Sequence, residues 1–346
     1  MSNEQTTPPI VYGDHPAAWT AESLMDQTEK WIYHLTGEDI AELDGALKHI
    51  QAKELIVPSF GKDDFEIPKL TAKLTPYLEE LNFGIGILQL KDFPIEKYSK
   101  DQASAIFWGI GAHIGTPQAQ NVRGHLLGDV RDEGRELSDP LARGYQTTET
   151  LPMHTDGSDF VALLCLKQAP EGGENQFCSS VAVYNKLATK SPEIARHLLD
   201  TKWCIDRRGE ESEGEPPYNK ARIYTPIEGA VTCVALVGYV FSAQRHDEVP
   251  RLTNRDKEAL EAFDKTTWDE DLVARVRQEE GDMLFLNNHY ILHARSTYTD
   301  AEDPYEKRHL RRLWLESNEW ASLRPAWQTS RTWIKPDPTV QMWDHM

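Results

Sequence analysis

The sequence lacks the features that mark membrane proteins, disulfide-rich proteins and nucleic-acid-binding proteins. It has no apolar run near the roughly 18 residues that a membrane helix needs, and residues 1–9 are polar with no apolar signal core. Acidic residues exceed basic ones by 56 to 37, and this net charge of −19 argues against a nucleic-acid or anionic-membrane partner. The few cysteines form no CxxC motif and are expected to be structural thiols in a reducing compartment: Cys165, Cys178, Cys204 and Cys233. A cytoplasmic protein follows by elimination.

The composition is typical of a folded globular chain. Of its 346 residues, 39% are hydrophobic and 9% are aromatic, which excludes a disordered chain and allows one large domain or two modest ones. There is no internal repeat and no low-complexity stretch.

The first 120 residues are predicted to be mainly helical. Thr36 and Asp39 form a capping arrangement ahead of apolar residues at helical spacing. Similar spacing predicts helices over 69–81 and 95–114, and residues 84–90 between them are predicted to form a strand.

After about Met153 the pattern changes to short strands interrupted by helices. The predicted strands cover 160–166, 221–241, 271–277, 282–287 and 311–316, and the predicted helices cover 192–199 and 253–263. Many short strands after a helical opening predict an all-β core with added helices, that is, a β-sandwich or jelly roll with helices packed outside.

No segment of the sequence has the composition of a linker. A single domain over 1–346 is therefore expected, with a helical N-terminal cover at about 20–120 and a jelly-roll core at about 83–320. A Pro- and Trp-rich C-terminal tail, 321–346, closes the chain.

Two histidines and one carboxylate form a candidate metal site. In His154-Thr155-Asp156 the first and third side chains point to the same side of an extended segment, so both can reach one ion. His293 lies 139 residues downstream, as expected when ligands come from different strands of one barrel. Two imidazoles and one carboxylate on one face of an iron leave positions open for a bidentate 2-oxo acid and dioxygen.

Chance alone can produce such a triplet. With 12 histidines and 56 acidic residues among 346 positions, about two HxD or HxE triplets are expected, and the chain contains two. The other, His246-Asp247-Glu248, lies in a polar stretch that is predicted to be an exposed loop. The triplet at 154–156 directly precedes the apolar strand at 160–166, at a rim where sites are usually built, and this position favours it.

Arginines at alternate positions follow His293. If the segment near residue 310 is a strand, Arg308 and Arg312 share one face, while His309 and Arg311 share the other. Two inward-facing arginines are costly unless anions meet them, and a 2-oxo acid with a distal carboxylate and an acidic substrate would supply those anions. The alternative is that these arginines pair with the plentiful surface acids.

In this order, these motifs resemble the TauD/TfdA superfamily of Fe(II)/2-oxoglutarate-dependent dioxygenases, especially its clavaminate synthase-like branch. The resemblance covers roughly 83–316 and rests on these stretches: Gly84-Ile85-Gly86, Gly115-Thr116-Pro117, His154-Thr155-Asp156, Gly172-Gly173 with Ser179, Gly281-Asp282, His293-Ala294-Arg295 and Arg308 to Arg312.

The resemblance implies a double-stranded β-helix (jelly roll) core in which His154, Asp156 and His293 bind Fe(II). It also implies that 2-oxoglutarate and O2 are co-substrates. Related halogenases replace the carboxylate ligand by a small residue to admit chloride, so the presence of Asp156 argues against halogenation.

The same resemblance assigns three further residues. Arg308 is expected to bind the distal carboxylate of 2-oxoglutarate, and Arg312 is expected to face the substrate pocket. Relatives carry a Thr or Ser shortly after the Gly-Gly turn that also contacts the co-substrate. Here Asn175 stands at that position, and its amide could donate a comparable hydrogen bond.

The sequence thus predicts an oxidoreductase that oxidises a small substrate and releases succinate and CO2. The expected substrate carries a carboxylate or sulfonate, as an amino acid or natural-product intermediate does, and the reaction is a hydroxylation, desaturation or oxidative cyclisation. Two alternatives stay open: a zinc-dependent hydrolase using the same three ligands with a bound water, and a non-catalytic jelly-roll binding protein. The motifs specify no oligomeric state.

Overall fold

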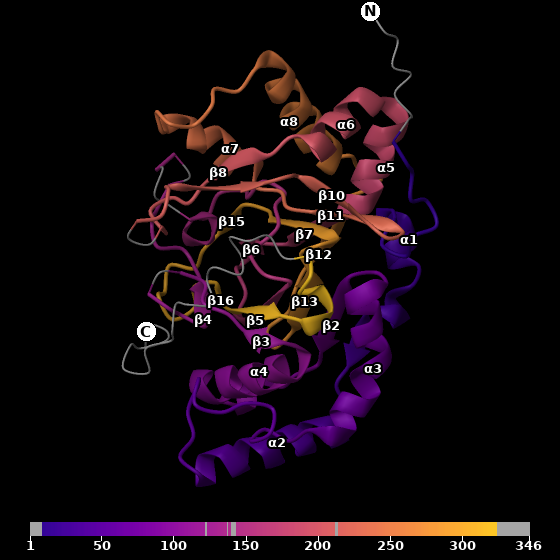
Figure 1. Cartoon of the computed structure of the whole chain (residues 1–346). Coiled ribbons are helices and arrows are strands. Elements are labelled where there is room, and N and C mark those ends of the chain that lie inside the picture. The colour runs from indigo at the N-terminus through magenta and orange to yellow at the C-terminus, as the bar shows by residue number, and fades with distance from the viewer. Residues whose placement is uncertain (1–8, 122, 137, 140–142, 212–213, 324–346) are drawn as a thin grey trace, which may run out of the picture.

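A computed structural model describes residues 9–121, 123–136, 138–139, 143–211 and 214–323. It shows short strands at the centre and helices on two opposite sides (Figure 1). Of the predicted C-terminal tail, residues 324–346 lie outside the described part of the chain.

The N-terminal helices form a layer against the larger sheet, at the bottom of Figure 1. They are α2 (Gly37–Ala52), α3 (Pro68–Phe83) and α4 (Lys100–Ile114), whereas the short helix α1 (Ala21–Met25) lies apart from this layer, at the right of Figure 1. The predicted cap is confirmed, because the Thr36 hydroxyl accepts a hydrogen bond from the Asp39 N–H at 3.3 Å and the Thr36 N–H donates to the Asp39 carboxylate at 2.8 Å. Helix α4 begins later than predicted, since Ser99 and Gln102 form its own capping box.

The larger sheet is built mainly from antiparallel strands. Its order is β1 (Ile32–His34), β2 (Ile87–Lys91), β13 (Met283–Asn287), β5 (Phe160–Lys167), β16 (His309–Glu316) and β3 (Thr116–Pro117), with β4 (Leu127–Val130) also paired to β16. Strand β5, predicted as a buried apolar run, lies between β13 and β16. A central place in the sheet explains why its side chains are apolar on both faces.

A smaller sheet packs on the first. Its order is β12 (Ala274–Val276), β7 (Asn175–Ser179) and β14 (Ile291–Arg295). Phe177 and Ile291 from this sheet belong to the same buried apolar cluster as Leu164 and Phe285 from the larger sheet. The two sheets therefore enclose one core, as in a jelly roll.

Further strand pairs and helices accompany the smaller sheet, with the helices in the upper half of Figure 1. They are β6 (Glu171–Gly172) with β15 (Tyr298–Thr299), β8 (Trp203–Asp206) with β9 (Tyr218–Ala221), β10 (Tyr224–Ile227) with β11 (Ala230–Cys233), and the helices α5 (Ser180–Lys190), α6 (Pro192–Asp200), α7 (Val237–Ser242) and α8 (Asn254–Thr267). A second apolar cluster holds this layer together.

One predicted sheet segment is wrong in part. Residues 221–241 form the β10–β11 hairpin, which turns at Gly229 with φ +75°, and then enter helix α7. A short apolar run fits a buried helix as well as a buried strand, so its periodicity did not separate the two.

The predicted fold class, an all-β core with added helices, is confirmed by these sheets. The single-domain organisation stays a prediction. Among the described residues, no helix is both long and apolar enough to cross a membrane.

Candidate metal and co-substrate site

A pair of backbone hydrogen bonds brings the two predicted histidine ligands together. The His154 N–H donates to the His293 carbonyl at 3.0 Å, and the His293 N–H donates to the His154 carbonyl at 2.9 Å. His293 is held on the buried strand β14, so this bridge fixes the loop before β5 against the smaller sheet. The two imidazole centroids lie 4.4 Å apart.

Asp156 completes the trio. One candidate ligand atom from each of His154, Asp156 and His293 lies within 4.8 Å of the others, and within the described ranges no other such group is found. The Nδ1 of His154 is engaged by the Pro152 carbonyl at 2.9 Å, which leaves Nε2 toward the Asp156 carboxylate at 3.9 Å. Two imidazoles and one carboxylate that converge in this way match a facial donor set for a divalent transition metal.

The protonation states of His293 and Asp156 suit a metal. Burial, and after it the neighbouring His154, lowers the pKa of His293 to about 3, so that its imidazole is neutral. Burial alone would raise the pKa of Asp156, but Arg312 above all holds it well below its usual range. A neutral imidazole and an ionised carboxylate are the forms that ligate metals.

Strand β16 orients the Asp156 carboxylate through two side chains. Its Oδ2 accepts hydrogen bonds from Trp314 Nε1 at 2.8 Å and from Arg312 Nη1 at 3.3 Å. The Asp156 N–H donates to Asn288 Oδ1 at 2.9 Å. The sequence prediction missed Trp314, although the strand period of two places it on the same face as Arg312.

Arg312 is therefore engaged near the metal trio. Its Nε donates to Gln120 Oε1 at 2.7 Å in addition to the bond with Asp156. Its guanidinium carbon lies 5.0 Å from the Tyr145 ring centroid, and its side chain also lines the cavity described below. Its predicted contact with substrate stays a prediction.

The predicted division of the arginines between two faces of β16 agrees with their contacts. Arg311 and His309 both bond Asp129, and Arg311 Nε also donates to Ser104 at 3.1 Å. Neither Arg308 nor Arg312 contacts Asp129 through a described hydrogen bond. The alternative, that all of these arginines pair with surface acids, does not describe Arg311, whose partner Asp129 is largely buried.

Arg308 is a buried cation whose Nε and Nη1 have no hydrogen-bond partner among the described residues. It is 2% exposed, and its guanidinium carbon lies 5.1 Å from the Tyr298 ring centroid. The Gly-Gly turn passes against it: a Cβ on Gly173 would stand 3.0 Å from Arg308 Nε. A Cβ on Gly172, which has φ +74°, would stand 2.1 Å from the Thr297 carbonyl oxygen, so this turn requires glycine.

Arg295, to which the sequence prediction gave no role, contacts the same Tyr298 ring as Arg308. Its guanidinium carbon is 4.7 Å from the Tyr298 ring centroid, and its Nη2 donates to the carbonyls of Thr147 and Glu149 at 2.8 and 2.6 Å. Burial and next the charge of Arg308 lower the pKa of Arg295 to about 10. Two buried cations that destabilise each other favour an anion between or beside them.

Asn175 begins strand β7 and pairs across the sheet with Arg295. Its Nδ2 donates to Gln278 Oε1 at 2.9 Å, and Gln278 Nε2 donates in turn to the carbonyls of Leu163 and Asp282. An amide nitrogen carries two hydrogens, so one remains for a second acceptor. The predicted co-substrate contact of Asn175 stays a prediction.

The other candidate histidines lie outside the trio. His289, four residues before His293, donates a hydrogen bond from Nε2 to Asp159 Oδ1 at 2.9 Å and stacks on Trp320 with 4.2 Å between ring centroids. His246, from the other triplet, His246-Asp247-Glu248, has its Nε2 3.3 Å from Asp206 Oδ1.

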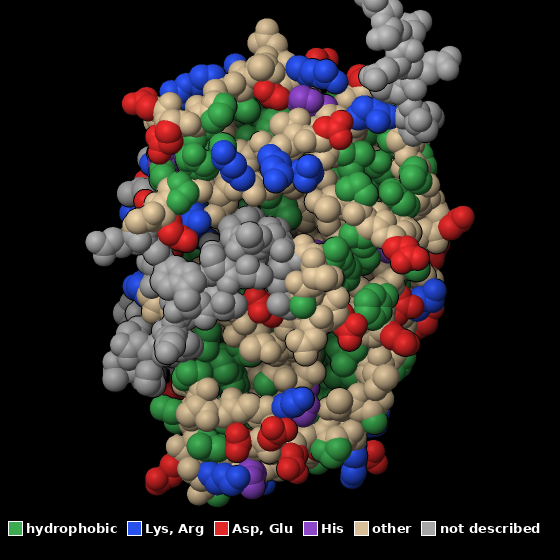
Figure 2. Space-filling model, in the orientation of Figure 1, with side chains coloured by type: hydrophobic (Ala, Val, Ile, Leu, Met, Phe, Trp, Pro, Cys, Tyr) green, Lys and Arg blue, Asp and Glu red, His purple; other side chains and the backbone are tan. Residues whose placement is uncertain are grey.

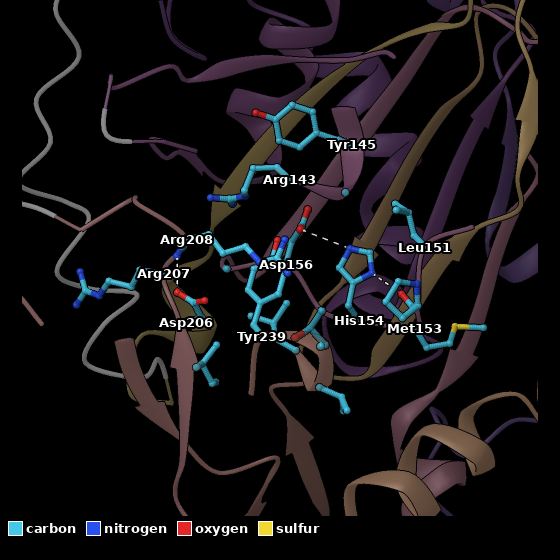
Figure 3. A pocket seen from close by; sticks show the side chains of 18 of the residues that line it. Arg143, Tyr145, Leu151, Met153, His154, Asp156, Asp206, Arg207, Arg208 and Tyr239 are labelled. Atoms are coloured by element: carbon cyan, nitrogen blue, oxygen red, sulfur yellow. Dashed lines mark hydrogen bonds and ion pairs between the residues drawn. The ribbon is translucent and has the colours of Figure 1, made fainter. Parts of the chain in front are cut away.

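A cavity of about 290 Å³ opens beside His154 and Asp156 (Figure 3). Apolar side chains line one part of its wall, including Leu151, Met153, Leu236 and Val237, and arginine and tyrosine side chains line another part, including Arg143, Tyr145, Arg208, Tyr239 and Arg312. An apolar wall with a few polar groups is typical of a small-molecule site.

Known proteins are similar to this chain in sequence. The model of the family described as "Taurine catabolism dioxygenase TauD, TfdA family" matches residues 50–314. The FR-33289 synthase of Streptomyces rubellomurinus is 30% identical over 325 residues, which cover 92% of this chain and 94% of that protein. The taurine hydroxylase-like protein SAT17 of Stachybotrys chartarum is 27% identical over 318 residues, which cover 88% of this chain and 80% of that protein.

Solved structures of non-haem iron oxygenases have a similar fold. Asparagine oxygenase in complex with Fe(II), 2S,3S-3-hydroxyasparagine and succinate superimposes with a TM-score of 0.65 at 15% identity, over 86% of this chain and 97% of that one. OrfP in complex with Fe gives a TM-score of 0.60 at 17% identity, over 85% and 96%. The family match and the sequence relatives span most of the chain, and therefore this protein belongs to the TauD/TfdA family of Fe(II)/2-oxoglutarate-dependent dioxygenases.

Proposed function

We propose that this dioxygenase hydroxylates a small anionic molecule in the cavity beside His154 and Asp156. One observation carries the proposal: a convergent trio of two imidazoles and a carboxylate occurs in the same core as the buried Arg308, whose Nε and Nη1 have no hydrogen-bond partner among the described residues. The first feature fits a metal, and the second fits the distal carboxylate of 2-oxoglutarate.

His154, Asp156 and His293 are the proposed Fe(II) ligands. The donor set fits the ion, because His293 is neutral and Asp156 is ionised, and three protein ligands leave room for co-substrate and gas. When bound, iron with 2-oxoglutarate and O2 supplies the oxidation of a substrate C–H bond, with release of succinate and CO2. The protein orients the carboxylate ligand through Trp314 and Arg312.

Arg308 is the proposed anchor of the co-substrate. A buried guanidinium whose Nε and Nη1 lack hydrogen-bond partners among the described residues is unfavourable, and a carboxylate can accept hydrogen bonds from it. Tyr298, whose buried hydroxyl has no partner among the described residues, and Arg295 lie beside this anchor. The second N–H of Asn175 is proposed to donate to the co-substrate, in the role that a Thr or Ser has in relatives.

The substrate is proposed to be a small molecule with a carboxylate, sulfonate or related oxyanion, such as an amino acid or a natural-product intermediate. The arginines of the cavity wall, Arg312 among them, support an anion. Hydroxylation is the proposed outcome because the similar asparagine oxygenase and OrfP structures contain hydroxylated amino acids.

A substrate screen tests this proposal. The enzyme, with Fe(II), 2-oxoglutarate and O2, is incubated with amino acids, carboxylates and sulfonates, and succinate and product mass are measured. We expect substrate-dependent succinate and a product that has gained one oxygen atom. We expect His293→Ala to abolish both and the exposed control His34→Ala to change neither.

Two results would contradict the proposal. A product that has lost two hydrogen atoms would replace hydroxylation by desaturation or cyclisation. Turnover without O2 and without succinate would indicate a hydrolase instead.

A further inference from the structure

The cavity wall is rich in positive charge although the chain carries a net charge of −19. Its charged side chains are Arg143, Arg207, Arg208 and Arg312, against Asp156 and Asp206. On the face shown in Figure 2, by contrast, Lys and Arg side chains are interspersed with Asp and Glu. A cationic cavity in an acidic protein favours an anionic ligand.

The two carboxylates of the wall are already engaged by other groups. Asp206 is 2% exposed, and its carboxylate accepts hydrogen bonds from Ser242 Oγ at 2.8 Å and from Arg245 Nη2 at 3.2 Å. Asp156 accepts from Trp314 and belongs to the proposed metal site. Each of these carboxylates thus has a cationic partner of its own, Arg245 for Asp206 and Arg312 for Asp156.

The arginines of the wall are not equivalent. Arg207 bonds Glu215, and Figure 3 shows its guanidinium directed away from Asp156. Arg312 bonds Gln120 and Asp156, so it positions the carboxylate ligand. Arg143 and Arg208 lie to the left of Asp156 in Figure 3, while His154 lies to its right.

Arg208 holds an unusual backbone conformation at this wall. Its φ is +54°, in the left-handed region that residues other than glycine enter at an energetic cost. The Arg208 N–H donates to Asp206 Oδ1 at 2.9 Å, and its guanidinium carbon lies 4.4 Å from the Tyr239 ring centroid. These contacts fix the start of the loop after β8 and aim the side chain toward Asp156 (Figure 3).

Arg143 reaches the same part of the cavity from a separate segment of the chain. Its side chain is 14% exposed, and its Nη1 lies 3.7 Å from the Glu210 carboxylate, which is too long for a hydrogen bond. A guanidinium has five N–H donors in a planar fork, so Arg143 has donors for a further oxyanion.

We propose that Arg143 and Arg208 together form the subsite that binds the oxyanionic group of the substrate, as a refinement that rests on the proposed function. The apolar part of the wall, with Leu151, Leu236 and Val237, then contacts the carbon chain of the substrate. A molecule held at its anionic end in this way presents a C–H bond on the side of Asp156 and His154. Arg143 and Arg208 thereby select substrates by charge and set which carbon is oxidised.

Titration calorimetry with simple probes tests the subsite. The probes are n-propylphosphonate, propane-1-sulfonate and butyrate, with 1-butanol as the neutral analogue. We expect at least one oxyanion to bind the full chain and the alcohol not to bind. The double variant Arg143→Gln, Arg208→Gln should weaken that binding at least about tenfold, because two charge-assisted contacts are lost.

Two control variants make the test specific. Arg207→Gln removes a positive charge from the same wall but from a side chain directed away, and should change the affinity by less than about twofold. Arg143→Lys with Arg208→Lys keeps the charge and should restore part of the affinity. Equal affinity of the alcohol, or wild-type affinity in the double glutamine variant, would overturn the subsite.

The same proteins separate this inference from the proposed function. The double glutamine variant should still form the anaerobic Fe(II)–2-oxoglutarate complex, detected by its visible absorption, because Arg308 and the metal trio are unchanged. If the wild-type protein did not form that complex, the proposed function would be contradicted. If the double glutamine variant formed the complex and also bound the anion with wild-type affinity, only the subsite would be contradicted.

Discussion

Replacing Arg308 by methionine is expected to stabilise the protein while weakening 2-oxoglutarate binding. Arg308 is 2% exposed, and its Nε and Nη1 have no hydrogen-bond partner among the described residues. Leaving a buried polar group unsatisfied costs roughly 1–3 kcal/mol, partly offset here by the attraction to the Tyr298 ring. Methionine has a similar length and no charge, so the free energy of unfolding should rise by about 1–2 kcal/mol.

The loss of affinity in the same variant should be larger. Removing one partner of a buried, hydrogen-bonded charge pair costs about 2–5 kcal/mol, which corresponds to a dissociation constant weaker by about 30-fold or more. Urea unfolding of the metal-free protein measures the first effect. Anaerobic titration of the Fe(II)-loaded protein with 2-oxoglutarate measures the second.

Arg311→Met is the matched control for this experiment. Arg311 is on the same strand and also 2% exposed, but it bonds Asp129 and Ser104. Its replacement leaves a largely buried carboxylate with one partner fewer, and should lower the free energy of unfolding by about 3 kcal/mol. Its 2-oxoglutarate affinity should not change. If Arg308→Met instead destabilised the protein and kept its affinity for 2-oxoglutarate, Arg308 would be a structural residue and the reasoning would be refuted.

Three further variants test other parts of the structure. Trp314→Phe keeps an aromatic ring but removes the N–H that orients the Asp156 carboxylate, so iron affinity measured by anaerobic titration should fall about tenfold. Gly172→Ala places a Cβ 2.1 Å from a backbone carbonyl at φ +74°, and the resulting loss of about 1–3 kcal/mol should appear as a lower thermal midpoint. Burial raises the pKa of Asp39, but hydrogen bonds from Lys73 and the helix cap lower it to about 2, so its stabilising contribution is complete above the ordinary carboxyl pKa of 3.8 and is lost as the pH falls toward 2. Asp39→Asn should therefore show a smaller loss of stability than wild type over that pH range, in acid unfolding followed by circular dichroism.

Local rules predicted much of the architecture. The Thr36–Asp39 cap and the apolar run at 160–166 depend on neighbouring residues, and the structure confirms a helix and a buried strand there. The triplet at 154–156 and His293 could be selected because each lies beside a predicted strand. That the three side chains converge could be seen only in the folded structure, because the backbone bridge between His154 and His293 joins residues far apart in the sequence.

The parts that sequence reasoning missed depend on distant contacts or on ambiguous short runs. Trp314 and Asp156 are 158 positions apart in the sequence, and no local pattern predicts the hydrogen bond between them. Tyr298 lies between two buried arginines only because β15 pairs with the Gly-Gly turn. Helix α7 was read as sheet because six residues are too few for a helical period to stand out.

The central claim is that His154, Asp156 and His293 hold one Fe(II) and leave positions open for 2-oxoglutarate. The most direct measurement is the visible absorption spectrum of the anaerobic protein with Fe(II) and 2-oxoglutarate. We expect a charge-transfer band in the wild type and in the exposed control His34→Ala, and no band in His154→Ala. A band of normal intensity in His154→Ala would contradict the ligand assignment.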